Sequence, residues 1–172
     1  MNPVLTGLFL DLSGFCDEDA ERIVFREYAK RYLDRPTQTG RVGVRKTHDG
    51  QDVVFFEDRF QHAFYTSGEK TSRQYAKDKF ERSRGERVAW IGPLLAGEIE
   101  GSECWLIPPK GGGRGLSRRP PNRFYLLRQE WYIVWLEPRR NAGWKFSSAY
   151  VAGHSIERYG QEGRLFWKKS TP

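Results

Sequence analysis

Three aromatic-rich segments in the second half of the chain constrain its fold most strongly. They span residues 123–128, 131–137 and 144–150, and short polar turns separate them. Closely spaced runs of aromatic and branched apolar residues between turn residues are typical of antiparallel strands. We therefore expect an antiparallel meander here, and we expect it to supply most of the hydrophobic core.

The N-terminal part contains a helix pattern followed by a hairpin pattern. Residues 17–33 begin with acidic residues, end with basic residues and carry an apolar face, which predicts a helix capped by Asp17. Residues 41–46 alternate basic and apolar side chains, and the turn residues HDG separate them from the apolar segment 53–56. This arrangement predicts a β-hairpin, and segment 58–66 follows it as a short helix.

The middle of the chain is less regular. Residues 67–84 are highly charged, which predicts a helix with most of its side chains in solvent. Residues 86–96 are apolar and fit either a helix or a buried strand, whereas residues 104–107 fit a short strand. The basic Gly/Pro-rich segment 108–122 predicts a long loop, and loops of this length are usually functional or disordered.

These elements define the α+β class, in which helices precede and interrupt a mainly antiparallel sheet. A loop or helical turn over 154–160 and an edge strand over 165–168 are expected at the C-terminal end. The length fits one domain with an extension. We therefore divide the chain into an N-terminal helical extension, residues 1–40, and a basic α+β domain, residues 41–172.

The charge balance favours a polyanionic partner. Lys and Arg total 29 against 22 Asp and Glu, which gives a formal net charge of +7. Nucleic acid is the first candidate and an anionic membrane surface the second, with an ordinary basic protein as the bland alternative. Arginines interleaved with aromatic residues favour RNA, because guanidinium groups bind phosphates and rings stack on unpaired bases.

Cysteine usage and the N-terminal segment indicate a compartment. Cys16 and Cys104 are the only cysteines and lack CxxC spacing, so a reduced intracellular chain is the simplest account, with one disulfide left open. The segment PVLTGLFLDL is apolar but short and lacks a basic lead-in, so it fits neither a signal peptide nor a membrane span. We therefore expect a cytoplasmic protein without a membrane partner.

The histidines invite a test for metal sites. His48 and His62 lack HxH or HExxH spacing, and the nearby carboxylates form no known ligand pattern. The chain also lacks a P-loop, a GxGxxG after a strand and a GxSxG, and its GGGRG run at 111–115 lies between proline pairs. We therefore expect neither a metal nor a cofactor.

Acid–base chemistry without a metal fits the residue types better. RNA cleavage by its own 2′-hydroxyl requires one group that takes the 2′ proton and one that protonates the leaving 5′ oxygen. Cations or hydroxyls must stabilise the extra negative charge on phosphorus, and histidine transfers protons readily near neutral pH. Residues of these types are His48, His62, Arg59, Arg87, Lys145, Ser147, Ser148 and Tyr150.

Each candidate also has a purely structural interpretation. His62 in QHAF can satisfy a carbonyl of the core, and His48 in KTHDG is more often an exposed turn residue. Arg87 can pair with Glu86, and WKFSSAY can be an ordinary strand. His154 lies in an expected loop, and we do not expect it to be catalytic.

The order of these patterns resembles one superfamily of nucleases. After the hairpin come a helix with DRFQHAF, the segment RGERVAWIGPLL and a meander whose last strand reads WKFSSAY. Over residues 41–150 the chain is similar to the phage- and prophage-encoded nucleases of the barnase–EndoU–colicin–RelE (BECR) superfamily. The resemblance implies a curved, mainly antiparallel sheet packed on N-terminal helices. It also implies metal-independent RNA cleavage, often of tRNA, that leaves a 2′,3′-cyclic phosphate.

The resemblance assigns a catalytic set residue by residue. His62 matches the histidine that follows the first hairpin, and Arg87 matches the arginine that opens the next helix. Ser148 and Tyr150 match the small hydroxyl and the tyrosine at the end of a late strand, with Ser in place of the commoner Thr. The substrate-binding residues expected around this set are Lys46, His48, Arg59, Arg84, Trp90, Lys145 and Ser147.

The favoured function is therefore a metal-independent endoribonuclease toxin. Its expected partners are RNA, with tRNA as one target, and an acidic antitoxin or immunity protein. Two other functions stay open. The first is a non-catalytic RNA- or DNA-binding module that uses the basic segment 109–123 and exposed aromatic residues. The second is a phage accessory protein-interaction domain that docks through the charged segment 69–84 and the Gly/Pro loop.

Overall fold

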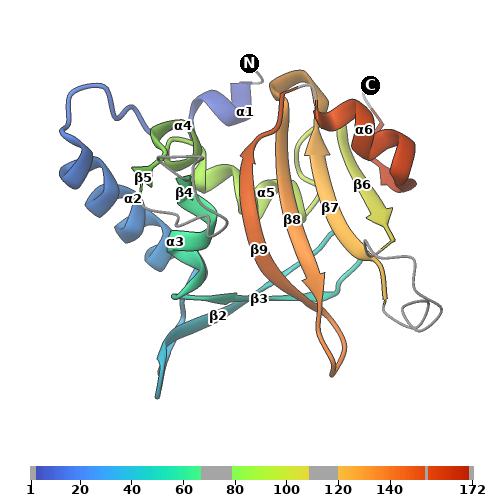
Figure 1. The fold of residues 1–172 in the computed structure, drawn as a ribbon, viewed down its shortest axis with the longest axis horizontal. Coiled ribbons are helices and arrows are strands. Elements are labelled where there is room, and N and C mark those ends of the chain that lie inside the picture. The colour runs from blue at the N-terminus through green and yellow to red at the C-terminus, as the bar shows by residue number, and fades with distance from the viewer. Residues whose placement is uncertain (1–2, 67–78, 109–119, 154, 171–172) are drawn as a thin grey trace, which may run out of the picture.

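A computed structural model describes residues 3–66, 79–108, 120–153 and 155–170 of the chain (Figure 1). These residues form an α+β structure with one eight-stranded sheet, as expected for the fold class. The helices and strands, in chain order, are α1 (Pro3–Thr6), α2 (Asp17–Tyr32), β1 (Arg35–Thr37), β2 (Gly40–Lys46), β3 (Asp52–Phe56), α3 (Arg59–Phe64), β4 (Tyr65–Thr66), β5 (Lys79–Phe80), α4 (Arg82–Gly85), η1 (Val88–Trp90), α5 (Ile91–Leu95), β6 (Ser102–Ile107), β7 (Asn122–Leu127), η2 (Arg128–Glu130), β8 (Tyr132–Pro138), β9 (Trp144–Val151), α6 (Ser155–Glu162) and β10 (Arg164–Lys168).

The large sheet has the strand order β1-β2-β3-β9-β8-β7-β6-β10. Its strands β7 to β9 form the antiparallel meander that the aromatic segments predict. The expected short strand β6 extends the meander, and β10 is the expected edge strand. The predicted hairpin is also confirmed, since β2 pairs with β3 in antiparallel register. The only parallel pairing among these strands joins β3 to β9.

The hairpin and the meander meet at a steep angle. In Figure 1, β2 and β3 run across the lower end of the more upright β7, β8 and β9. Only two residue pairs join β3 to β9, Val53 with Trp144 and Val54 with Lys145. The strand direction therefore changes sharply at this junction.

One face of the sheet forms the main hydrophobic core with the helices α1 to α5. Tyr28 and Tyr32 of α2 pack on Phe55 of β3 and Phe146 of β9, with the Tyr32 and Phe55 rings stacked 4.6 Å apart. The Tyr32 hydroxyl donates to the Val88 carbonyl at 2.8 Å, so a polar group buried in this core is satisfied. The division at residue 40 stays a prediction, and residues on both sides of it belong to this one core.

The opposite face of the meander has a smaller apolar cluster under α6. Phe124 and Leu126 of β7 point into this cluster, whereas Tyr125 and Leu127 point into the main core. Ile156 of α6 is 2% exposed and closes the cluster. Helix α6 lies over the β6–β7 side of this face (Figure 1). Side chains of β8 and β9 line a cleft beside it.

Several local expectations need correction. Helix α2 begins after Cys16, which makes no side-chain cap, and Asp17 instead accepts a 2.8 Å hydrogen bond from Arg82. Of the helix expected over 67–84, residues 67–78 lie outside the described residues, and the rest forms β5 and the short helix α4. The acidic first turn of α2 and its basic last turn still suit the helix dipole.

The alternatives left open elsewhere are now decided. Segment 86–96 is helical, through η1 and α5, so the strand alternative is wrong. Of the loop or helical turn expected over 154–160, the helical alternative is the correct one, because α6 spans Ser155–Glu162, with residue 154 itself outside the described part. Residues 109–119 of the expected Gly/Pro loop also lie outside it.

Candidate active site

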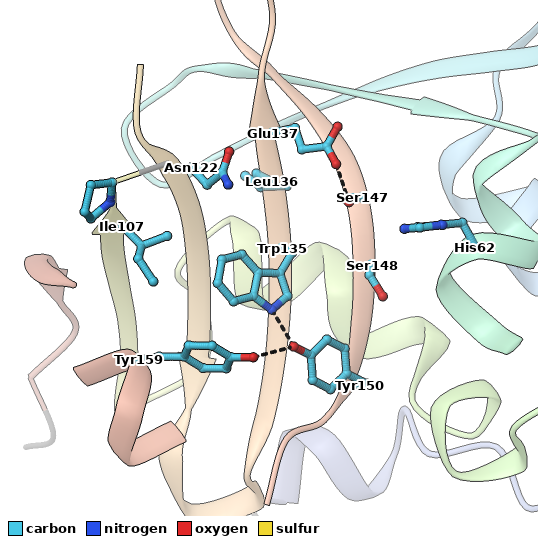
Figure 2. Close-up of a pocket in the computed structure, with 11 residues that line it drawn as sticks. His62, Ile107, Asn122, Trp135, Leu136, Glu137, Ser147, Ser148, Tyr150 and Tyr159 are labelled. Carbon is cyan, nitrogen blue, oxygen red and sulfur yellow. Dashed lines mark hydrogen bonds between the residues drawn. The ribbon is translucent and has the colours of Figure 1, made fainter. Parts of the chain in front are cut away.

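A cleft of about 450 Å³ opens on the α6 face of the meander, between α3 and α6 (Figure 2). Residues of strands β6 to β9 form most of its lining, and the two helices contribute one residue each, His62 of α3 and Tyr159 of α6. Residues that line it are His62, Ile107, Pro108, Asn122, Trp135, Leu136, Glu137, Ser147, Ser148, Tyr150 and Tyr159. Four of these, His62, Ser147, Ser148 and Tyr150, are site residues predicted from the sequence.

Helix α3 presents His62 to the cleft. Phe60, Ala63 and Phe64 are buried on one face of α3, and the helix packs against β9. His62 is off that face and exposed, and its ring points toward the strand that carries Ser147 and Ser148 (Figure 2). His62 is therefore not buried in the core.

A β-bulge sets the positions of the two serines on β9. Ser148 lies opposite Trp135, but the next register pair is Phe146 with Leu136, so Ser147 is the extra residue of the bulge. Because of this extra residue, the side chains of two adjacent serines reach the same cleft. The Ser147 hydroxyl donates to the Glu137 carboxylate at 2.8 Å.

Glu137 is a cleft carboxylate that the sequence interpretation missed. Its other oxygen lies 2.8 Å from the Lys145 ammonium, on the neighbouring strand. Burial raises the pKa of Glu137, but the bonds from Lys145 and Ser147 and the charge of Arg59 outweigh burial and hold it below its ordinary value. Glu137 is therefore ionised at neutral pH and can accept a proton. The sequence held one signal for this carboxylate: Glu137 ends one expected strand, and Lys145 lies at the start of the next.

Aromatic rings form the wall opposite His62. The Trp135 indole donates to the Tyr150 hydroxyl at 2.8 Å, and the Tyr150 and Tyr159 hydroxyls are 3.3 Å apart. Burial raises the pKa of Tyr150, so its phenol keeps its proton at neutral pH. Since an indole only donates, the Tyr150 hydroxyl retains its proton for a second bond. The sequence interpretation missed Trp135 and Tyr159, which are separated from the serines in the chain.

Arg84 brings a cation to this wall. Its guanidinium lies 5.2 Å from the centre of the Tyr150 ring and donates to the carbonyls of Ala63 at 3.1 Å and Tyr65 at 3.3 Å. It thereby joins the C-terminal end of α3 to β9. Burial lowers the pKa of Arg84, which nevertheless remains a cation at neutral pH, as arginine does in proteins.

The structure does not bring Arg87 or Trp90 to the cleft, which corrects two expected site residues. The Arg87 guanidinium lies over the rings of Phe9 and Trp90, donates to the Ser83 carbonyl at 2.6 Å and is 3.7 Å from Glu86. Trp90 is fully buried, and its indole donates to the Leu5 carbonyl at 3.2 Å. Both residues fasten the N-terminal segment to the core.

His48 and Lys46 also lie away from the residues that line the cleft. His48 stacks on Trp167 with ring centres 4.1 Å apart, and its Nδ1 is 2.8 Å from the Tyr125 hydroxyl. Burial lowers the pKa of His48. It is half-buried rather than the exposed turn residue of the structural interpretation. Lys46 pairs with Asp52 at 2.6 Å at the end of the hairpin.

Comparisons with protein families, with curated proteins and with solved structures found no match. The BECR resemblance therefore stays a prediction from the sequence patterns. Within the described ranges, no group of three or more His, Cys, Asp or Glu side chains is arranged to hold a metal ion. In the same part of the chain, no helix is long and apolar enough to cross a membrane.

Proposed function

We propose that the protein is a metal-independent endoribonuclease and that the cleft between α3 and α6 is its active site. The observation that carries this proposal is the lining of one cleft by His62 of α3 and Glu137 of β8. Concerted acid–base chemistry at a phosphodiester needs a proton acceptor and a proton donor, and an ionised carboxylate and an imidazole can serve as such a pair.

The proposed reaction is attack of the 2′-oxygen of a ribose on the adjacent phosphorus. Glu137 accepts the 2′ proton as the new P–O bond forms, and protonated His62 donates a proton to the departing 5′-oxygen as the P–O5′ bond breaks. The products are a 2′,3′-cyclic phosphate and a free 5′-hydroxyl, so no water, metal or redox partner is required. His62 regains its proton and Glu137 loses its proton to solvent between turnovers.

Hydroxyls and cations beside the cleft are suited to the charge that develops on phosphorus. The Tyr150 hydroxyl accepts from Trp135, so its own proton can bond either the Tyr159 hydroxyl at 3.3 Å or a non-bridging phosphate oxygen. Arg84 supplies positive charge beside Tyr150. Lys145 supplies positive charge beside Glu137. Donors and cations that are fixed before the substrate arrives stabilise a developing anion most effectively.

The aromatic wall supports RNA with unpaired bases as the substrate. Trp135 and Tyr159 meet edge to face with ring centres 5.1 Å apart, and both line the cleft. Exposed rings bind bases by stacking, which is open only to bases that are not paired in a duplex. A cleft of about 450 Å³ is within the usual range for small-ligand sites and has room for a nucleotide.

Incubation of purified protein with single-stranded RNA in EDTA tests the proposal. We expect cleavage in EDTA, and we expect His62→Ala to reduce the rate by about 10²–10⁴-fold, the usual contribution of a general acid or base. His62 is exposed on its helix, so the variant should keep the wild-type thermal midpoint. Full activity of a folded His62→Ala variant, or loss of wild-type activity in EDTA, would contradict the mechanism.

Binding without cleavage would instead favour the alternative of a non-catalytic RNA- or DNA-binding module. The tRNA target, the toxin role and the acidic antitoxin or immunity protein follow from the family resemblance alone and stay predictions. The accessory-domain alternative is tested by the same experiment, because it expects neither cleavage nor RNA affinity at low salt.

A further inference from the structure

A second, shallow groove lies on the outer surface of α2, away from the cleft. Its volume is about 430 Å³, and its lining residues come from α2 and from β2. These residues are Arg22, Phe25, Arg26, Ala29, Lys30 and Arg41. Four of the six are cations, and none of the residues that the structure describes around this groove adds a carboxylate to its lining.

The helical spacing aligns three of the cations. Arg22, Arg26 and Lys30 are four residues apart, so they lie in a row on one side of α2. Like charges at this spacing destabilise a helix, so the row is not explained by the stability of α2. With a rise of 1.5 Å per residue, the row is about 12 Å long.

The row is available to a ligand. Arg26 and Lys30 are exposed, and neither side chain forms an ion pair or hydrogen bond with the described residues. Arg22 is 71% exposed and has only an exposed partner, Asp19, at 2.7 Å, which is a weak pairing in water. Arg41 is held in place by its bond to the Leu33 carbonyl at 2.9 Å.

Acidic side chains elsewhere on α2 are engaged away from the groove. Glu27 pairs with Arg31 at 3.1 Å. Glu21 forms a hydrogen bond with Tyr65, and burial, followed by this bond, raises the pKa of that phenol to about 12. The exposed Asp19 is therefore the only α2 carboxylate paired with a cation of the groove among the described residues.

The groove and the cleft lie on either side of α3. Phe25 lines the groove and meets Phe60 of α3 edge to face, with ring centres 5.0 Å apart. His62, two residues further along α3, lines the cleft. Arg59 is half-exposed on the same short helix and is close enough to influence Glu137 electrostatically. Cations thus continue from the cleft across α3 to the groove (Figure 1 shows α2 beside α3).

We propose that this groove binds the phosphate backbone of single-stranded RNA and so forms a second contact for the strand held in the cleft. A row about 12 Å long matches about three or four phosphates of a stacked strand at roughly 3.4 Å each. The inference extends the proposed function, but RNA binding by the groove does not itself require catalysis. An acidic polypeptide is the competing ligand, and the test below separates the two.

The test measures RNA affinity against salt concentration in full-length protein carrying His62→Ala, so that RNA stays intact. The groove variant adds Arg26→Ala and Lys30→Ala. Removal of two phosphate contacts should flatten the slope of log K against log salt by about 1.4, at about 0.7 per contact with a single strand. Alanine favours helix, so α2 should persist, and Arg26→Gln with Lys30→Gln is a second variant that keeps side-chain length.

The matched control removes two cations from the far edge of the sheet, with Arg164→Ala and Lys168→Ala on β10. Both residues are exposed, and Glu103, the partner of Lys168, keeps its 2.8 Å pair with Arg128. We expect the control to keep the slope of its parent. Equal slopes for the groove variant, the control and the parent would overturn the inference. Polyglutamate serves as the acidic-polypeptide probe, and a groove variant that loses affinity for polyglutamate but not for RNA would also overturn it.

Cleavage by protein with native His62 is measured separately. A flattened slope without any cleavage would support the groove inference and contradict the proposed function. Cleavage with an unchanged slope would support the proposed function and overturn the groove inference.

Discussion

Glu137 of β8 and Lys145 of β9 are direct partners in the sheet register, and their side chains form a 2.8 Å ion pair beside the cleft. The pair holds a carboxylate in its ionised form in the cleft that His62 also lines, where the proposed reaction needs a proton acceptor. Because Lys145 lowers the pKa of Glu137, this ion pair should also set the pH dependence of the proposed reaction.

The first prediction concerns this contact. Lys145 lowers the pKa of Glu137, so Lys145→Met should raise that pKa toward the ordinary value for glutamate. Glu137 acts as a base only when ionised, so the acidic limb of the kcat/KM profile should move to higher pH. The profile of Lys46→Met, which removes a lysine paired with Asp52 instead, is the control. An acidic limb at the wild-type position in Lys145→Met would show that Glu137 is not the base.

The second prediction separates the two arginines of segment 82–90. Arg84→Met should lower kcat/KM by about tenfold, because the cation nearest to Tyr150 is lost, and Arg84→Lys should restore part of that loss. Arg87→Met should leave kcat/KM unchanged and lower the free energy of unfolding, since Arg87 contacts Phe9 and Trp90 in the core. Kinetics and urea denaturation of the same preparations check both. A slow but fully stable Arg87→Met protein would contradict this assignment.

The third prediction concerns Tyr150. Tyr150→Phe keeps the ring but removes the acceptor of the Trp135 indole and the proposed phosphate donor. We expect a lower kcat with KM for RNA little changed, and a loss of about 1 kcal/mol in the free energy of unfolding. Tyr159→Phe, which removes the other hydroxyl of the pair, should leave kcat near wild type. Equal kcat values for the two variants would remove Tyr150 from the reaction.

The fourth prediction concerns stability at acid pH. Arg123 is 5% exposed and forms two bonds to Asp49, at 2.9 and 3.0 Å. Burial raises the pKa of Asp49, but the bonds from Arg123 and Thr47 outweigh burial and hold the pKa below 3.8. The pair therefore stabilises the fold fully above about pH 3.8. This contribution is lost as the pH falls through the lower pKa of the folded state.

Asp49→Asn tests this pair. At neutral pH the variant should lose about 2 kcal/mol of unfolding free energy, less than the ~3–5 typical of fully buried pairs, because Asp49 is 27% exposed. The difference from wild type should shrink as the pH falls below about 3.8, since wild-type Asp49 then becomes neutral as well. Urea titrations over a pH series measure the difference. A difference that stays constant to pH 2.5 would contradict the account.

Sequence patterns predicted those parts of the fold that depend on neighbouring residues. The meander, the hairpin and the long helix α2 follow from local runs of aromatic, alternating and amphipathic residues. The parallel pairing of β3 with β9 could not be predicted, because it joins residues about ninety positions apart through only two residue pairs. Similarly, residues 88–96 lack charged and polar side chains, so their period did not distinguish a helix from a buried strand.

Those residues of the candidate site that belong to local sequence motifs were also predicted. His62, Ser148 and Tyr150 belong to short motifs, and the structure brings all three to one cleft. The choice between Arg84 and Arg87 depended on the backbone around Gly85, where α4 ends and the next residues turn toward the core. Glu137 was missed because its contacts with Lys145 and Ser147 of β9 depend on the register of the sheet, which the strand ends in the sequence only suggest.

The chemical ends of the RNA products test the central proposal most directly. Wild-type protein is incubated in EDTA with an RNA oligonucleotide and, in parallel, with the same oligonucleotide carrying a 2′-O-methyl group at the cut position. Mass spectrometry then measures the masses of the products. We expect a 2′,3′-cyclic phosphate and a 5′-hydroxyl from the first RNA and no cut at the methylated position. Cleavage of the methylated RNA at the same position, or a 5′-phosphate product, would contradict the account.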